Sequence, residues 1–312
     1  MTNTTIALRR QIGSAGDLKS VVRTMKASAA SAIGQYERSV AALGDYARTV
    51  ELGLGVCLRS VASEGEHAHL PSRQVEDPVV HAVVFGSDQG LVGRFNEVVV
   101  EHALAQLAPT AATVHLWAVG ERVQARLQDA KLPPAGSFPV PGSVEQITRL
   151  VGRLLLKIPV LGGEPAGGSQ AATSGASLML FYNRPSGSGY APVTQRLLPL
   201  DGPWQRELAG QPWPTQQLPE VLGRSRGSNA QALRAFIREH LFVSLFRASA
   251  ESLASENASR LAAMQRADKN IGVLLTELGA QFNRLRQSGI DEELFDVIAG
   301  FDAMTPQASQ HG

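Results

Sequence analysis

Apolar residues recur at steps of three and four at both ends of this 312-residue chain, whereas prolines interrupt the middle. At the N-terminal end the recurring residues are Leu18, Val22, Met25, Ala29, Ala32, Tyr36, Val40, Leu43, Ala47, Val50 and Leu54. At the C-terminal end they are Met264, Ala267, Ile271, Leu274, Leu278, Phe282 and Leu285. This is the heptad spacing of helices that wind round each other. We therefore expect the two ends of the chain to form a coiled coil.

The first helix is predicted over about residues 6–60 and the second over about residues 228–287, with Gly289 resetting the register before a last helical stretch. Because the helices come from opposite ends of a folded middle, an antiparallel pair is the easiest arrangement. Glycines within the first helix each cost up to about 1 kcal/mol relative to alanine, so packing against a partner has to hold it. In an alternative interpretation, Gly13 and Gly16 break the helix, which then begins at Asp17.

Sixteen of the seventeen prolines lie between Pro71 and Pro219, where predicted strands alternate with helices. The strands cover residues 79–87 and 114–120, and the helices cover residues 96–107, 121–129 and 144–157. This alternation is typical of a parallel, doubly wound sheet. Two further strands, over residues 177–183 and 193–200, are expected as a hairpin or as neighbours at the sheet edge. Between the helices and these strands, Leu161 to Ser177 is a surface loop of low complexity.

The expected fold is α/β, with a long antiparallel coiled coil of the N- and C-terminal helices and a central Rossmann-like α/β domain. The predicted boundaries are residues 1–70 for the first helix, 71–219 for the α/β domain and 220–312 for the second helix.

Composition excludes several classes of protein. Cys57 is the only cysteine, so the chain can form neither an intramolecular disulfide nor a cysteine-based zinc site. We find no apolar run of the length that a membrane span needs, and no signal-peptide core, so we expect the chain to stay in the compartment where it is made. The first helix is basic but lacks interleaved aromatic residues, which favours an acidic protein partner over nucleic acid.

The turn GSDQGLVG, Gly86 to Gly93, follows a strand and precedes a helix, where many α/β proteins bind phosphate. It lacks the Lys-Ser/Thr ending of a P-loop and the glycine spacing of a dinucleotide site. We therefore interpret it as a structural loop that includes Asp88, Gly90 and Gly93, in which Asp88 and Asn96 cap or fix the conformation.

Candidate chemistry elsewhere is sparse. His67 and His69 are close in sequence, but they lack a third ligand at metal-binding spacing. The chain has no nucleophile elbow. We expect no catalytic residue, no metal site and no cofactor.

Three parts of the chain, namely the first helix, the turn and the second helix with two motifs, together resemble the γ subunit of F-type ATP synthases. In residues 8–30, Val21, Arg23, Met25 and Lys26 follow the opening pattern of that family. SDQGLVGRFN, residues 87–96, is similar to its SDRGLCGGFN. ESLASENASRLAAMQRADKN, residues 251–270, and FNRLRQSGIDEELFDVIAGFDAM, residues 282–304, are similar to its C-terminal motifs.

The chain also departs from the family pattern, at Gly13, Gly16, Val92, Arg94 and Asp291. These differences suggest a divergent branch, for which the sodium-translocating type is one candidate.

The resemblance implies a central rotor shaft that couples ion-driven rotation to a catalytic head without catalysing the reaction itself. Its implied partners are the α and β subunits, the ε subunit and the membrane ring of c subunits, on the cytoplasmic face of the bacterial inner membrane. Arg23, Met25 and Lys26 would face the β subunits, and Arg286 and Gln287 would engage a loop on one of them.

Two alternatives stay open on periodicity and composition alone. One is a soluble coiled-coil adaptor with an α/β head and no rotary partner, which has no evident need for the Arg286–Gln287 string. The other is a nucleotide-binding enzyme, for which Arg94 is the only candidate basic residue beside the turn.

Overall fold

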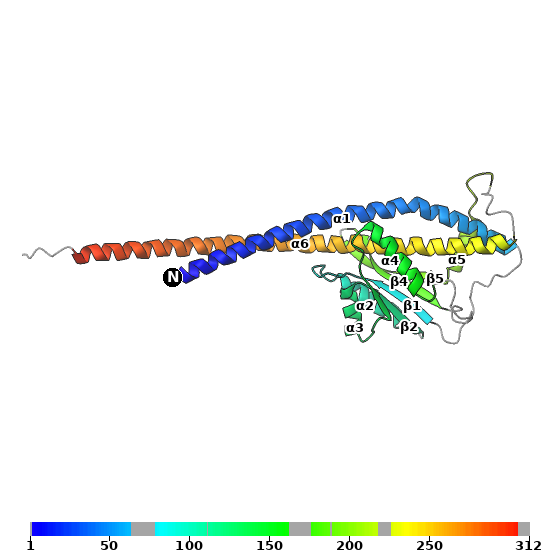
Figure 1. Cartoon of the computed structure of the whole chain (residues 1–312), viewed down its shortest axis with the longest axis horizontal. Coiled ribbons are helices and arrows are strands. Elements are labelled where there is room, and N and C mark those ends of the chain that lie inside the picture. The colour runs from blue at the N-terminus through cyan, green and yellow to red at the C-terminus, as the bar shows by residue number, and fades with distance from the viewer. Residues whose placement is uncertain are drawn as a thin grey trace, which may run out of the picture. The chain divides into compact units, whose positions relative to one another are not determined.

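The structure, a computed structural model, describes residues 2–63, 79–110, 112–161, 176–187, 189–217 and 226–304. It divides into two compact units: a paired-helix unit of Met1–Ser28 and Leu261–Gly312, and a sheet unit of Ala29–Arg260. The long helices α1 (Thr2–Ser63) and α6 (Arg226–Met304) contribute to both units (Figure 1). No helix in the described ranges carries an apolar stretch that could span a lipid bilayer.

In the paired-helix unit, α1 and α6 lie side by side and antiparallel. The guanidinium of Arg9 lies 5.5 Å from the centre of the Phe282 ring. Further along α1, Arg23 forms an ion pair of 3.6 Å with Asp268. The partner on α6 moves toward the N-terminus as the position on α1 moves toward the C-terminus. The predicted antiparallel pairing is therefore confirmed.

The apolar stripe that holds this pair is narrower than the sequence pattern indicated. Leu8, Ala15, Val22, Ala29 and Tyr36 are buried on α1, at intervals of seven residues. In the paired-helix unit, Ala15 and Val22 pack with two buried residues of α6, Met264 and Ile271.

Two leucines that the pattern placed on the stripe lie outside it. Leu18 is 54% exposed and Leu274 is 45% exposed. A helix with a single neighbour buries only the centre of its apolar face, so the flanking positions of each heptad stay in contact with water.

Glycine does not interrupt either helix. The helix α1 runs through Gly13 and Gly16, and α6 runs through Gly289, so the proposed break at Asp17 and the proposed reset of register are both wrong. Close packing occurs at two other glycines, in the sheet unit. A Cβ atom at Gly53 would collide with the ring of Phe236, and one at Gly55 would collide with the backbone carbonyl of Leu208.

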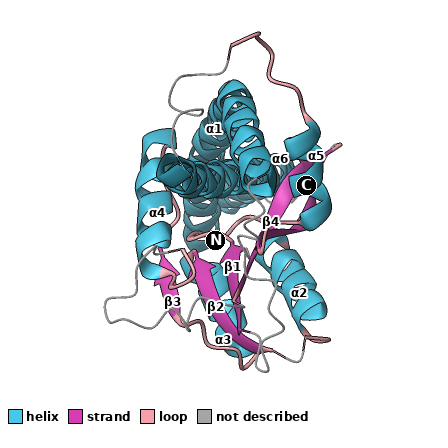
Figure 2. Cartoon of the chain, turned by 90° about the vertical axis from the view of Figure 1, so that its right-hand side faces the viewer, coloured by secondary structure: helices cyan, strands magenta, loops and turns pink. Residues whose placement is uncertain are grey.

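The sheet unit contains one five-stranded sheet in the order β3-β2-β1-β4-β5. Its strands are β1 (Val79–Phe85), β2 (Thr113–Val119), β3 (Gly136–Phe138), β4 (Ser177–Ser186) and β5 (Gly189–Leu198). The neighbouring strands β3, β2, β1 and β4 pair in parallel (Figure 2), and β5 joins β4 antiparallel at the edge. The predicted parallel sheet with an edge hairpin is confirmed.

Helices cover both faces of this sheet. On one face, α2 (Phe95–Leu107) and α3 (Glu121–Asp129) pack against Ala82 and Val84 of β1. On the other, α4 (Val144–Lys157), α1 and α6 pack against Val83 and Phe85. Successive side chains of a strand point to opposite faces, so β1 contributes to both cores.

Two elements were not foreseen. The strand β3 has only three residues, which is too short for an alternation pattern. The helix α5 (Gly202–Gly210) lies in a proline-rich passage for which the sequence analysis predicted no helix, and Asp201 caps its N-terminus. The predicted domain boundaries at residues 70/71 and 219/220, and most of the loop Leu161 to Ser177, lie outside the described residues, so those boundaries stay a prediction.

Replacing Met264 with alanine should lower the free energy of unfolding by about 2–5 kcal/mol, because this side chain is only 2% exposed and lies in the paired-helix core. Denaturant unfolding of the full chain, followed by circular dichroism, measures the loss. The matched control is Leu274→Ala on the same helix, which should cost less than about 1 kcal/mol. Equal losses at the two positions would contradict the observed stripe.

Candidate functional site

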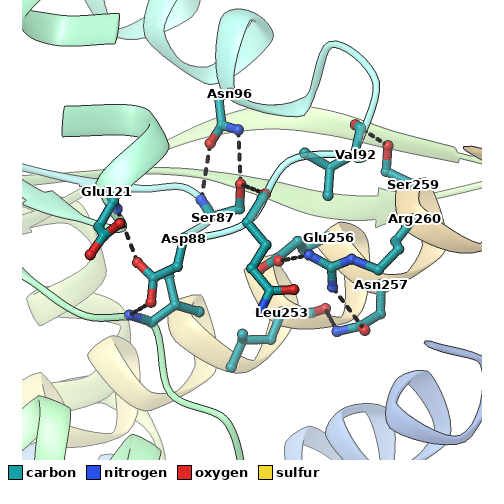
Figure 3. Close-up of polar contacts among 12 residues, drawn as sticks. Ser87, Asp88, Val92, Asn96, Glu121, Leu253, Glu256, Asn257, Ser259 and Arg260 are labelled. Atoms are coloured by element: carbon teal, nitrogen blue, oxygen red, sulfur yellow. Dashed lines mark hydrogen bonds and ion pairs between the residues drawn. The ribbon is translucent and has the colours of Figure 1, made fainter. Parts of the chain in front are cut away.

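The turn from Gly86 to Gly93 joins β1 to α2, and Asp88 fixes it to two other segments (Figure 3). One carboxylate oxygen of Asp88 accepts a hydrogen bond of 2.9 Å from the Glu121 N–H, at the first turn of α3. The other accepts one of 2.9 Å from the Val140 N–H. Both oxygens are therefore engaged by backbone donors, which gives Asp88 a structural part in the loop.

Ser87 and Asn96 close the turn on itself. The Ser87 N–H donates to Asn96 Oδ1 and Asn96 Nδ2 donates to Ser87 Oγ, each at 2.9 Å. Ser87 is fully buried and Asn96 is 6% exposed. This reciprocal pair holds the chain as it leaves the strand and enters α2.

The two glycines predicted to shape the turn differ in their roles. Gly93 has a φ of 57°, a conformation that a residue with a side chain adopts only with strain. A Cβ atom at Gly90 would meet nothing closer than 3.8 Å, so neither space nor conformation requires glycine there.

The turn rests on α6. The sequence analysis did not predict which residues of α6 make this contact. The Ser259 hydroxyl donates to the Val92 carbonyl, across 167 positions of the chain. Nearby on the same helix, Glu256 is 4% exposed and accepts a hydrogen bond of 2.6 Å from Arg260. The sequence carried a signal for this contact, because the turn and residues 251–270, which include Ser259, both resemble motifs of the same family.

Burial raises the pKa of the Glu256 carboxyl, Arg260 opposes that shift, and the negative charge of Asp88 adds to it. Asp88 occupies the N-terminus of α3. Negative charge at this position disfavours a bound phosphate. These contacts support the structural interpretation of the turn over the nucleotide-binding one.

Among the described residues, no group of three or more His, Cys, Asp or Glu side chains is arranged to hold a metal ion. The pair His67 and His69 lies outside the described residues.

The predicted partner-contact residues fall into two groups on the paired-helix unit. Arg23 and Lys26 converge on Asp268, with N–O distances of 3.6 and 3.5 Å. Met25, between them in sequence, is half-buried against the core around Met264. All three therefore contact α6 within the chain, an arrangement that the sequence did not predict.

Arg286 and Gln287 form the second group, and both are exposed. They lie about 27 Å further along α6 than Asp268, at 1.5 Å per residue. Because α6 continues to Met304, Arg286 lies about five turns before the helix end. An interpretation in which Arg286 only caps the helix C-terminus is therefore wrong.

Replacing Asp88 with asparagine should lower the free energy of unfolding by about 1–3 kcal/mol, because an amide can accept from only one of the two backbone N–H groups. Thermal or denaturant unfolding of the full chain measures this loss. Asp129→Asn, at the exposed end of α3, is the control and should change little. Unaltered stability of the Asp88 variant would show that the turn does not depend on these contacts.

Comparison with known proteins places the whole chain in one family. A family model described as ATP synthase matches residues 4–304. The ATP synthase gamma chain of Paramagnetospirillum magneticum is 24% identical over 95% of this chain and 98% of its own length. The gamma chain of Fuscovulum blasticum is 28% identical, again over 95% of this chain and 98% of its own.

Solved structures show the same fold. A chain of the Euglena gracilis mitochondrial ATP synthase, in an OSCP/F1/c-ring structure, aligns over 100% of both chains with a TM-score of 0.59 and 15% identity. A chain from the central stalk and c-ring of the Tetrahymena thermophila mitochondrial enzyme covers 79% of this chain, with a TM-score of 0.52 and 19% identity. With the family match across both long helices and the sheet, the chain belongs to the family of γ subunits of F-type ATP synthases.

Proposed function

We propose that this chain is the central rotor shaft of an F-type ATP synthase and couples ion-driven rotation to ATP synthesis or hydrolysis in a head of α and β subunits. The observation that carries this proposal is the family match over residues 4–304, which spans both helices of the antiparallel pair and the sheet between them in sequence. A coiled-coil adaptor accounts for the helix pair but not for that match.

The chemistry of the paired-helix unit suits a shaft that turns inside a sleeve. A turning surface has to release each contact, which favours small side chains and solvent-screened charges over deep apolar interlocking. Ala27 and Ser28 are exposed there, next to Arg23, whose side chain is 65% exposed. Such a surface can pass acidic loops of β subunits and bias each subunit toward a different nucleotide state by differential contact.

The subunit itself would be non-catalytic. In the turn from Gly86 to Gly93, both carboxylate oxygens of Asp88 accept hydrogen bonds from backbone N–H groups. The buried carboxylate of Glu256 is paired with Arg260. We assign no cofactor to it. The proposed further partners are the ε subunit and the membrane ring of c subunits, with the complex on the cytoplasmic face of the bacterial inner membrane. Assignment to the sodium-translocating branch stays a prediction.

The first test is the Met25→Lys variant in the complex purified from its native membrane. In that preparation the parent chain should purify together with α, β, ε and c subunits. The added cation lies beside Arg23 and Lys26 and can form a persistent ion pair with a β carboxylate, worth about 1 kcal/mol if exposed. The variant complex should hydrolyse ATP but pump fewer ions per ATP than the parent.

Met25→Leu is the matched control, because it keeps the apolar contact with the Met264 core without adding charge. A Met25→Lys complex that pumps as efficiently as the parent would remove Met25 from the proposed contact with β subunits.

The second test is the double variant Arg286→Ala with Gln287→Ala. An arginine can bind a carboxylate through two hydrogen bonds and a glutamine amide can donate and accept, so the pair can form a contact that is made and broken at each step. Because both side chains are exposed, the melting temperature of the free subunit should stay nearly unchanged. Turnover of the assembled complex should fall.

The control is Arg284→Ala with Gln281→Ala, which removes the same side-chain types from other exposed positions of the same helix. Equal losses of turnover in both variants, or a lower melting temperature without a loss of turnover, would contradict a specific contact at Arg286 and Gln287.

A further inference from the structure

A hollow of about 360 Å³ lies within the sheet unit, where α1, β5, α5 and α6 meet. Its ionisable lining side chains are Glu51 on α1, Arg196 on β5, Asp201 before α5, and His240 and Arg247 on α6. Apolar side chains, the indole of Trp204 and the uncharged polar residues Gln195 and Ser244 form the rest of the wall. The volume is in the range of about 300–1,000 Å³ typical of small-molecule sites.

Arg247 is the feature of this hollow that the fold does not explain. Its Nε atom is buried without a hydrogen-bond partner. Elsewhere on α6 a buried carboxylate meets an arginine: Glu251 binds Arg184 at 2.7 Å, and Glu256 binds Arg260 at 2.6 Å. The ion pairs of the described residues include none for Arg247. A buried N–H group without an acceptor is costly, and an anion in the hollow would supply an acceptor for the Nε–H of Arg247.

Two aromatic rings that pack against each other line the hollow together with this guanidinium. The centres of the Trp204 and His240 rings lie 4.7 Å apart, with the ring planes tilted by 39°. Burial, helped by the charge of Arg247, lowers the pKa of His240 to about 4, so the imidazole is neutral near pH 7. The wall beside Arg247 therefore offers stacking area rather than a second cation.

The other charges of the lining limit the charge of a ligand. Glu51 and Asp201 line the same hollow as Arg196 and Arg247, so the four formal charges cancel. A polyphosphate would add several negative charges next to two carboxylates. A single negative charge directed at Arg247 avoids most of that repulsion.

We propose that this hollow binds a soluble monoanion with a flat apolar body, such as an aromatic carboxylate. The carboxylate would accept hydrogen bonds from Arg247, and the apolar body would lie against Trp204 and His240. This proposal goes beyond the rotor function.

The test is calorimetric titration of the full-length chain with benzoate and with benzamide, its uncharged analogue. Benzoate should bind at least about tenfold more tightly than benzamide, because only its carboxylate forms charge-assisted hydrogen bonds. Arg247→Gln should weaken benzoate binding by about tenfold or more. The matched control, Arg149→Gln, removes an exposed arginine of α4 outside the hollow and should bind benzoate like the parent.

A measurement on the unaltered chain keeps the proposal testable if Arg247→Gln fails to fold. Benzoate should shift the ring resonances of His240 in nuclear magnetic resonance spectra, whereas it should leave those of His115, outside the lining, in place.

Three results would overturn the proposal. These are no benzoate binding, benzoate binding that persists unchanged in Arg247→Gln, and benzoate binding that leaves His240 unshifted. Vesicles of phosphatidylglycerol, compared with phosphatidylcholine, separate a lipid source of the anion from a soluble one. Arg247-dependent binding to anionic vesicles without benzoate binding would assign the hollow to a lipid headgroup and overturn the soluble ligand.

Discussion

The structure depends on one constraint: neither long helix can bury its apolar stripe alone. A single helix in water is marginal, and the glycines within α1 make it weaker still. In the paired-helix unit the solution is an antiparallel neighbour, with Val22 and Met264 in a shared core and Asp268 held by two cations of α1. The contact stripe is narrow, which leaves most of each helix surface free.

In the sheet unit the same two helices have a broader partner. Tyr36 of α1 and Leu245 of α6 share a core with Val83 and with α4, so the sheet and the helices bury each other. The turn after β1 strengthens this packing, because Ser259 of α6 reaches the Val92 carbonyl and Asp88 joins the turn to α3. A motif that resembles a phosphate loop is thus used to hold elements together, and the Asp88 carboxylate at the N-terminus of α3 disfavours a bound phosphate.

The proposed rotor function requires buried cores that hold the helices together and exposed positions that meet the catalytic head. In this chain the two differ in residue type. Cores contain leucine, valine and methionine, whereas the exposed positions proposed to meet the catalytic head carry small or charged side chains. Arg23 and Lys26 belong to both, since each pairs with Asp268 while keeping much of its side chain in water. A contact with a β subunit at this place would therefore compete with an ion pair inside the chain.

The sequence by itself determined the helix pair, the parallel sheet with its edge hairpin, and the family, because periodicity, strand alternation and motif strings are local properties of the chain. It could not determine which heptad positions are buried, as Leu18 and Leu274 show, because burial depends on how much of a helix its neighbour covers. It also missed β3 and α5, whose formation depends on a neighbouring strand and a capping Asp201. Only the tertiary structure brought Ser259 to Val92 and left the buried Nε–H of Arg247 without an acceptor, because contacts between distant segments arise from packing and leave no trace in local spacing.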